Sequence, residues 1–147
     1  MTTNLIRQLR GDEGSQATVY RDSLGLWTLR VGRLVDPSKP GAGLRPAEID
    51  MLLANDVKDR IDALAQRLPW IAELDEARQG VLLNMSFQLG VAGLLGFVNT
   101  LALVKAGRWE EAARGMLASK WAQQTPNRAG RLAQQMRTGE WQFAPGT

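Results

Sequence analysis

The chain has 147 residues, of which 44% are hydrophobic, so its length fits a single domain with enough apolar side chains for a core. It contains no Cys and no His, which excludes disulfides, zinc–thiolate sites and catalytic sites built on Cys–His or Ser–His–Asp. Any hydrolytic chemistry therefore has to use carboxylates, Lys, Tyr or hydroxyl groups.

The net charge of +3 is unevenly distributed, because residues 105–147 carry seven basic and three acidic side chains. A basic region attracts polyanions such as nucleic acid, anionic lipid or the bacterial cell wall. The chain has no phosphate-binding loop, zinc-finger pattern or aromatic RNA-binding motif, so we expect no nucleic-acid partner. An ordinary solvated helical face would explain the same basic side chains.

The first third of the chain predicts a short helix followed by strands. Leu5 and Leu9 lie on the apolar side of the helix, which is expected to end near Gly11 and Gly14. Residues 16–35 are rich in strand formers, and the sequence "RDSLG" within them is typical of a reversal between two strands. The N-terminus lacks the apolar core of a secretory signal.

The remainder predicts helices only. An apolar stripe from Pro46 to Leu68 indicates one long helix that begins at a proline. Residues 79–104 contain no charged side chain, but Asn, Gln, Ser and Gly interrupt them, so we expect buried helices joined by a Gly-rich turn and no stable membrane insertion. The expected helices after the long one are 75–89, 97–106, 108–118 and 126–137.

The order of these elements predicts an α+β fold with two lobes. A small antiparallel sheet lobe would occupy about residues 12–58, and the long helix would join it to a helical lobe. The helical lobe would comprise about residues 1–11 and 65–147 of a single domain.

Glu13 is the first candidate for chemistry. It continues the four-residue spacing of Leu5 and Leu9, so a helix extended this far directs it along the apolar face. Loss of hydration there would raise the pKa of the carboxyl, which suits a general acid. A surface Glu beside a helix end explains the same pattern without function.

Asp22 and Thr28 are the second and third candidates. Asp22 lies in the expected turn, and Thr28 shares a strand face with Arg30 and Gly32. Turn preference and strand propensity explain each residue by itself. Taken together with Glu13, two carboxylates and a hydroxyl in a chain without His favour a glycosidase.

Several segments in collinear order resemble one known family. "DEG…VYRDSLG…WT…VG" is followed by "NMSFQLG", "GFVNTL", "RWEEAA" and "TPNRAGR…RTGEW". These segments are similar to phage-type lysozymes of glycoside hydrolase family 24, in the branch of the T-even phages. The resemblance implies a muramidase that cleaves the β-1,4 bond between N-acetylmuramic acid and N-acetylglucosamine in peptidoglycan.

The resemblance also assigns roles to individual residues. The family's contact Asn falls on Gly115, so this contact is lost, and Arg30 stands where the family has Gly and would face the cleft. This resemblance implies three catalytic residues, Glu13, Asp22 and Thr28. It implies that the substrate site is lined by Arg30, Gly32, Leu34, Phe87 and Thr100. It also implies supporting residues: Arg128, which supports the catalytic Glu, and the pair Arg33–Asp56, which replaces a His–Asp pair of the family.

We therefore expect an inverting endolysin that needs no cofactor and no metal. Its partner would be bacterial peptidoglycan, and it would act as a monomer. It would accumulate in the host cytoplasm and depend on a separate membrane-permeabilising protein to reach the wall. Two alternatives stay open: a lytic transglycosylase, and a non-catalytic protein that binds the wall or disrupts membranes.

Overall fold

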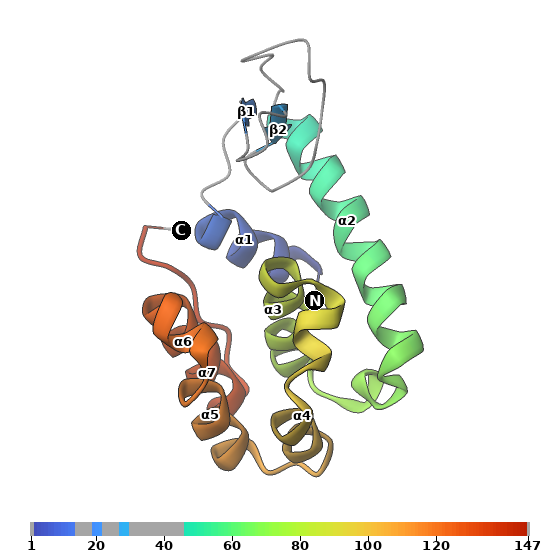
Figure 1. The fold of residues 1–147 in the computed structure, drawn as a ribbon. Coiled ribbons are helices and arrows are strands. Elements are labelled where there is room, and N and C mark those ends of the chain that lie inside the picture. The colour runs from blue at the N-terminus through green and yellow to red at the C-terminus, as the bar shows by residue number, and fades with distance from the viewer. Residues whose placement is uncertain (1, 14–18, 22–26, 30–45, 147) are drawn as a thin grey trace.

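A computed structural model describes residues 2–13, 19–21, 27–29 and 46–146, and helices predominate among them (Figure 1). In chain order the elements are α1 (Thr2–Glu13), β1 (Val19–Arg21), β2 (Trp27–Leu29), α2 (Pro46–Arg67), the 3-10 helix η1 (Pro69–Glu73), α3 (Glu76–Leu95), α4 (Val98–Lys105), α5 (Trp109–Leu117), α6 (Lys120–Gln124) and α7 (Pro126–Thr138).

The helices predicted from apolar periodicity are confirmed, and local signals explain their ends. The long helix is α2, which begins at Pro46. Asp75 accepts a hydrogen bond from the backbone N–H of Arg78 at the start of α3, and Gly139 ends α7 at φ 74°, a conformation that favours glycine. α3 runs beyond the predicted residue 89 because Gly90, at φ 76°, forms a kink instead of an end.

The predicted α+β class with a sheet lobe is wrong. The described part of the chain is mostly helical, and its strands are β1 and β2 alone, with three residues each, paired antiparallel so that Tyr20 lies opposite Thr28. A strand pair this short buries too little surface to form a lobe of its own. Strand propensity reports fit to a half-buried surface and does not fix how much sheet forms. The division into residues 1–11, 12–58 and 65–147 stays a prediction.

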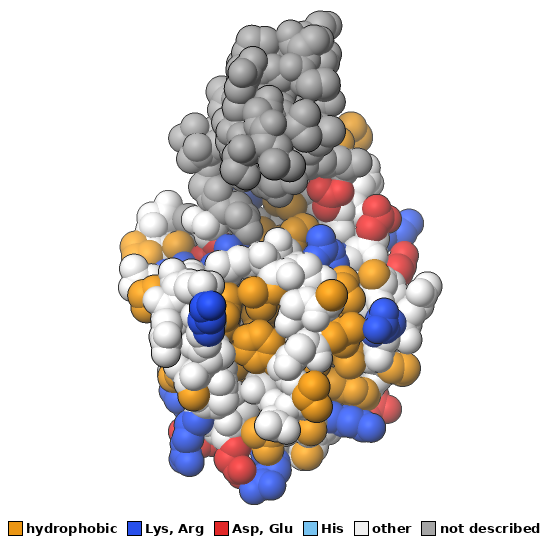
Figure 2. Space-filling view, viewed as in Figure 1, with side chains coloured by type: hydrophobic (Ala, Val, Ile, Leu, Met, Phe, Trp, Pro, Cys, Tyr) orange, Lys and Arg blue, Asp and Glu red, His pale blue; other side chains and the backbone are white. Residues whose placement is uncertain are grey.

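The core lies between helices, and α3 is its central element. All residues from Gly80 to Ser86 are buried, because α3 packs against α1, α2 and α7 at once. The first part of the uncharged segment is therefore in the core, as predicted, whereas Val98 farther along is 69% exposed. Within the described ranges no single helix is long and apolar enough to cross a membrane; α3 and α4 pass that test only together, and they are bent by 104°. Figure 2 shows apolar side chains gathered over these two helices.

α1 lies where three parts of the molecule meet. It packs against α2 and α3, and the C-terminal tail, residues 140–146, returns to it from the end of α7 (Figure 1). In this contact the guanidinium carbon of Arg7 lies 3.8 Å from the ring centroid of Phe143, and Gln8 Nε2 donates to the carbonyl oxygen of Gln142. The tail therefore fixes the outer side of the helix that ends at Glu13.

Candidate active site

The last turn of α1 carries two acidic residues, Asp12 and Glu13. Leu5 and Leu9 are fully buried, and the helix continues past Gly11 to Glu13; the predicted direction of the Glu13 side chain stays a prediction. The side chain of Asp12 is 1% exposed. A carboxylate at the C-terminal end of a helix is unfavourable beside the helix dipole, so a buried one needs strong compensation.

Two arginines of α7 and an asparagine of α3 provide this compensation. Arg131 Nη2 lies 2.6 Å from Asp12 Oδ1, and Arg128 Nε lies 3.6 Å from Asp12 Oδ2. Asn84 Nδ2 donates to the same Oδ2 at 2.9 Å. A buried charge is tolerated when it is both paired and hydrogen-bonded, and Asp12 meets both conditions.

Arg128 is held by the same asparagine. Its Nε and Nη2 atoms donate to Asn84 Oδ1 at 2.9 and 2.6 Å, and only 7% of the residue is exposed. The resemblance predicted that Arg128 supports Glu13. The structure brings Arg128 to the end of α1, against Asp12, the chain neighbour of Glu13.

Sequence reasoning missed Asp12, Asn84 and Arg131 as members of this cluster. Asp12 adjoins the candidate acid, and Asn84 interrupts an uncharged segment. A polar side chain in a helix that is otherwise buried usually has a partner, and this was the signal available. Nothing local in the sequence pairs residues 72 to 119 positions apart.

Phe87, a predicted sugar contact, lies half-buried on α3. The guanidinium carbon of Arg60, from α2, lies 4.8 Å from its ring centroid, which is a cation–π geometry. Arg60 Nη1 also donates to the carbonyl oxygen of Ser86. These contacts join α2 to α3 and bring a cation beside the predicted sugar contact.

Thr100, the other predicted contact with a described side chain, lies on α4 and is 7% exposed. A Cβ atom added to Gly115 of α5 would lie only 2.7 Å from Thr100 Oγ1. The threonine hydroxyl therefore occupies the space that a side chain at residue 115 would need. This explains sterically why the missing family asparagine has no room here.

The other predicted residues are placed only in part. Glu13 ends α1 and Thr28 is the middle residue of β2; for both, the description covers the backbone. Asp56 lies half-buried on α2. The remaining predicted residues, Asp22, Arg30, Gly32, Arg33 and Leu34, lie outside the described residues, so the pair Arg33–Asp56 and the cleft position of Arg30 stay predictions.

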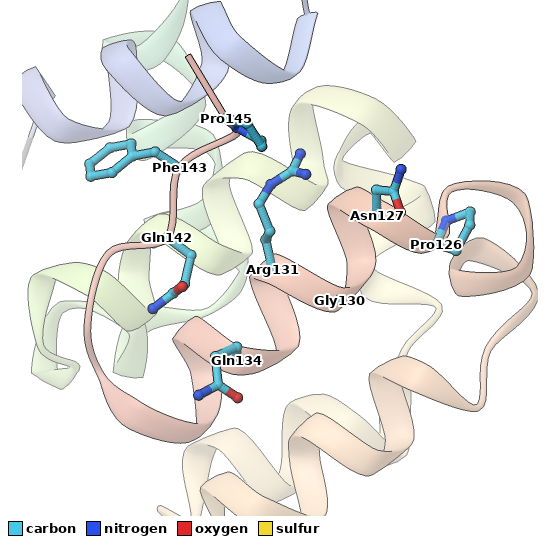
Figure 3. A pocket seen from close by; sticks show the side chains of 8 residues that line it. All are labelled: Pro126, Asn127, Gly130, Arg131, Gln134, Gln142, Phe143 and Pro145. Carbon is cyan, nitrogen blue, oxygen red and sulfur yellow. The ribbon is translucent and has the colours of Figure 1, made fainter. Parts of the chain in front are cut away.

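An open groove of about 640 Å³ lies between α7 and the C-terminal tail. Figure 3 shows Arg131 and Gln134 on the helix side, and Gln142, Phe143 and Pro145 on the tail side. Among the residues that the structure describes, no predicted site residue lines it. Of the described lining residues, Arg131 reaches Asp12 with its guanidinium.

Comparison with known proteins gives consistent results. A family model described as phage lysozyme matches residues 10–137. The chain is 27% identical to "Probable T4-type lysozyme 1" of Dictyostelium discoideum, over 95% of this chain and 96% of that protein.

Two phage proteins match over smaller shares of their own length. The first is the pre-baseplate central spike protein Gp5 of Enterobacteria phage T4, at 31% identity over 92% of this chain and 28% of that protein. The second is the peptidoglycan hydrolase gp36 of Pseudomonas phage phiKMV, at 26% identity over 90% of this chain and 15% of that protein. This chain therefore corresponds to one part of each of these larger proteins.

Proposed function

Because the chain belongs to the phage lysozyme family, we propose that it is a peptidoglycan hydrolase that cleaves the β-1,4 bond between N-acetylmuramic acid and N-acetylglucosamine. The observation that supports this most directly is the fixed acidic end of α1. Asp12 is buried and bound by Asn84, Arg128 and Arg131, and Glu13 follows it directly in the chain. A general acid has to be held in one position, and a helix end anchored in this way meets that requirement.

In the proposed mechanism, Glu13 protonates the leaving glycosidic oxygen. Asp22 and Thr28 hold a water molecule on the opposite face of the sugar, so that direct attack inverts the anomeric configuration. The residues proposed to contact the glycan are Arg30, Gly32, Leu34, Phe87 and Thr100. No cofactor or metal takes part in this scheme, because protonation, base catalysis and water attack account for every bond change.

The first test is the release of reducing ends from purified peptidoglycan by the wild type and by Glu13→Gln. An amide cannot donate the proton that the leaving oxygen needs, so the rate should fall about 10²- to 10⁴-fold. Glu73→Gln, at an exposed position of η1, is the matched control and should keep full activity. Equal rates for Glu13→Gln and the wild type would contradict the role of Glu13.

The second test is the anomer first released from a defined oligosaccharide, read by NMR before mutarotation. Initial release of the α-anomer would support inversion, whereas the β-anomer would show retention and overturn the roles given to Asp22 and Thr28. Thr28→Ala should slow the reaction less than Glu13→Gln does, because Asp22 could still recruit water in poorer geometry.

The reaction products and a bacterial killing assay distinguish the two alternatives. Anhydro-sugar ends would identify a lytic transglycosylase, in which an internal hydroxyl replaces water. Bacterial killing that survives Glu13→Gln would identify a protein that binds the wall or disrupts membranes without catalysis. Hydrolytic ends together with loss of killing in Glu13→Gln would support the muramidase.

We further propose that the enzyme acts as a monomer in host lysis, from the host cytoplasm, after a separate protein has permeabilised the membrane. Membership of a phage lysozyme family supports this role. Production in a bacterial cytoplasm should leave cells intact until chloroform permeabilises the membrane, and rapid lysis should then follow. Glu13→Gln should give no lysis after chloroform, and lysis by the wild type without chloroform would contradict the proposal.

A further inference from the structure

Three buried amide side chains connect the C-terminal tail to the acidic end of α1. They are Gln135 of α7, Gln8 of α1 and Asn84 of α3, and each is at most 1% exposed. A buried amide without partners is strongly unfavourable. Every hydrogen bond between these groups therefore restricts how its neighbour can be oriented.

The tail backbone sets the orientation of the first two amides. The N–H of Gln142 donates to Gln135 Oε1 at 3.0 Å, and Gln135 Nε2 donates to the carbonyl oxygen of Ala77 at 2.7 Å. Gln135 Oε1 thus faces Gln8, whose Nε2 donates to it at 2.6 Å and to the carbonyl oxygen of Gln142 at 2.5 Å. With two acceptors at its Nε2, Gln8 has to direct its Oε1 the other way.

Gln8 Oε1 is directed at Asn84. It accepts a hydrogen bond from Asn84 Nδ2 at 3.1 Å, while the same Nδ2 donates to Asp12 and Asn84 Oδ1 accepts from Arg128. Rotation of the Asn84 amide by 180° would set its NH₂ group against the guanidinium of Arg128. It would also set its oxygen against two acceptors, Gln8 Oε1 and Asp12 Oδ2. Without Gln8, one N–H of Asn84 would lose its partner in a buried position.

We propose that Gln8 is a positioning residue, which orients Asn84 and through it holds Asp12 and Arg128 in place behind Glu13. This inference rests on the proposed function of Glu13 as the acid. Glu13 follows Asp12 directly, so a displaced Asp12 displaces the backbone of Glu13. Small errors in the position of a catalytic group lower the rate of the chemical step more than they weaken binding of a long glycan.

The test is Gln8→Met, which keeps the length of the side chain and removes its amide. The expected result on peptidoglycan is a kcat about tenfold below the wild type with KM within twofold. Val104→Ala is the control, because Val104 is fully buried in α4 and the change removes packing but no side-chain hydrogen bond. A kcat for Gln8→Met within twofold of this control, or a KM raised more than twofold, would overturn the inference.

A double variant keeps the test valid if Gln8→Met folds poorly. In Gln8→Met/Gly130→Ala the second change should raise the melting temperature without restoring the amide, because a Cβ atom on Gly130 would meet no described atom within 4 Å and alanine favours a helix over glycine. A merely structural role predicts that kcat recovers together with the melting temperature. The positioning role predicts that the melting temperature rises above that of Gln8→Met while kcat stays low.

A measurement independent of activity separates this inference from the proposed function. The side-chain NH₂ protons of Asn84 should exchange slowly in the wild type and at least tenfold faster in Gln8→Met by NMR. If the wild type fails to cleave peptidoglycan, the proposed function fails and this exchange measurement alone decides whether Gln8 orients Asn84. Equal exchange rates in the two proteins would overturn the positioning role.

Discussion

The two ends of α7 are held by arginine in different ways. At the N-terminal end, Arg128 and Arg131 of α7 itself contact the buried carboxylate of Asp12. At the C-terminal end, Arg78 of α3 donates from Nε to the carbonyl oxygen of Met136 at 2.7 Å and from Nη2 to that of Arg137 at 3.0 Å. The N-terminal end is therefore held by ion pairs. The C-terminal end is held by hydrogen bonds from a guanidinium to carbonyl groups at the end of the helix.

The difference lies in what happens when one partner is removed. At the N-terminal end, loss of Asp12 would remove a carboxylate from beside Arg128, whose side chain is 9% exposed. At the C-terminal end, loss of Arg78 would leave two neutral carbonyl groups and the carboxylate of Asp75, which is 41% exposed and stays hydrated. Removing one partner of a buried ion pair costs far more than losing hydrogen bonds to neutral groups or an exposed ion pair, so the same residue type should matter to different degrees at the two ends.

The largest effect is expected for Asp12→Ala. The change removes the buried carboxylate that Arg128 and Arg131 contact and should lower the free energy of unfolding by about 3–5 kcal/mol, measured by urea denaturation. Asp62→Ala, at an exposed position of α2, is the control and should change it by less than about 0.5 kcal/mol. A loss below about 1 kcal/mol for Asp12→Ala would show that the buried cluster rehydrates easily and would remove the contrast between the two ends.

A smaller loss is expected for Arg78→Met, which keeps an aliphatic stem but removes the charge. The guanidinium bonds to two carbonyl groups and lies 4.2 Å from the ring centroid of Trp109, so we expect a loss of about 2 kcal/mol. Hydrogen exchange should accelerate in the last turn of α7 and not in its first turn. Arg67→Met, at the exposed end of α2, is the control, and equal melting of both variants would contradict the capping role.

A third comparison uses two glycines in helices that pack together. A Cβ atom on Gly80 of α3 would collide with the ring of Trp141 in the tail, whereas one on Gly130 of α7 would meet no atom of the described residues within 4 Å. Gly80→Ala should therefore cost about 1–2 kcal/mol through overpacking, and Gly130→Ala should stabilise by up to about 1 kcal/mol through helix propensity. The two melting temperatures should move in opposite directions, and a rise for Gly80→Ala would show that the tail is loosely packed.

The helices were predictable from the sequence because their apolar periodicity is local. Pro46 begins α2, as the sequence predicted, and α7 covers Pro126–Thr138 where 126–137 was expected. The extent of sheet was not predictable, because strand formers in residues 16–35 do not determine how many strands pair. The last turn of α1 ends at Glu13, and in it Asp12 contacts Arg131 of α7, 119 positions away in the chain. A pattern in neighbouring residues cannot predict a contact over such a separation.

The motifs predict the reactive groups of the candidate site and one supporting residue, Arg128, but not the amides around it. Glu13 and Arg128 follow from the motifs, and the structure brings Arg128 to the end of α1. The amides that orient this cluster, Gln8 and Asn84, look ordinary in the sequence. Their importance comes from burial and from a single allowed orientation, and both are properties of the folded arrangement.

The smallest effect is expected for Glu110→Gln, at the start of α5 and beside the C-terminal end of α7. Glu110 is 51% exposed, and its oxygens lie 2.7 Å from Arg137 Nε and 3.6 Å from Arg114 Nε. Water already screens this carboxylate, so the loss of two ion pairs and of a favourable helix-dipole contact should cost only about 0.5 kcal/mol.

The difference from the wild type should disappear in 1 M NaCl, where the screening length falls to about 3 Å, whereas the loss caused by Asp12→Ala should persist because salt does not reach a buried pair. Glu140→Gln, at an exposed position of the tail, is the control for a loss of charge alone. A loss above about 2 kcal/mol for Glu110→Gln, or one that 1 M NaCl leaves unchanged, would mean that burial does not separate the two ends of α7.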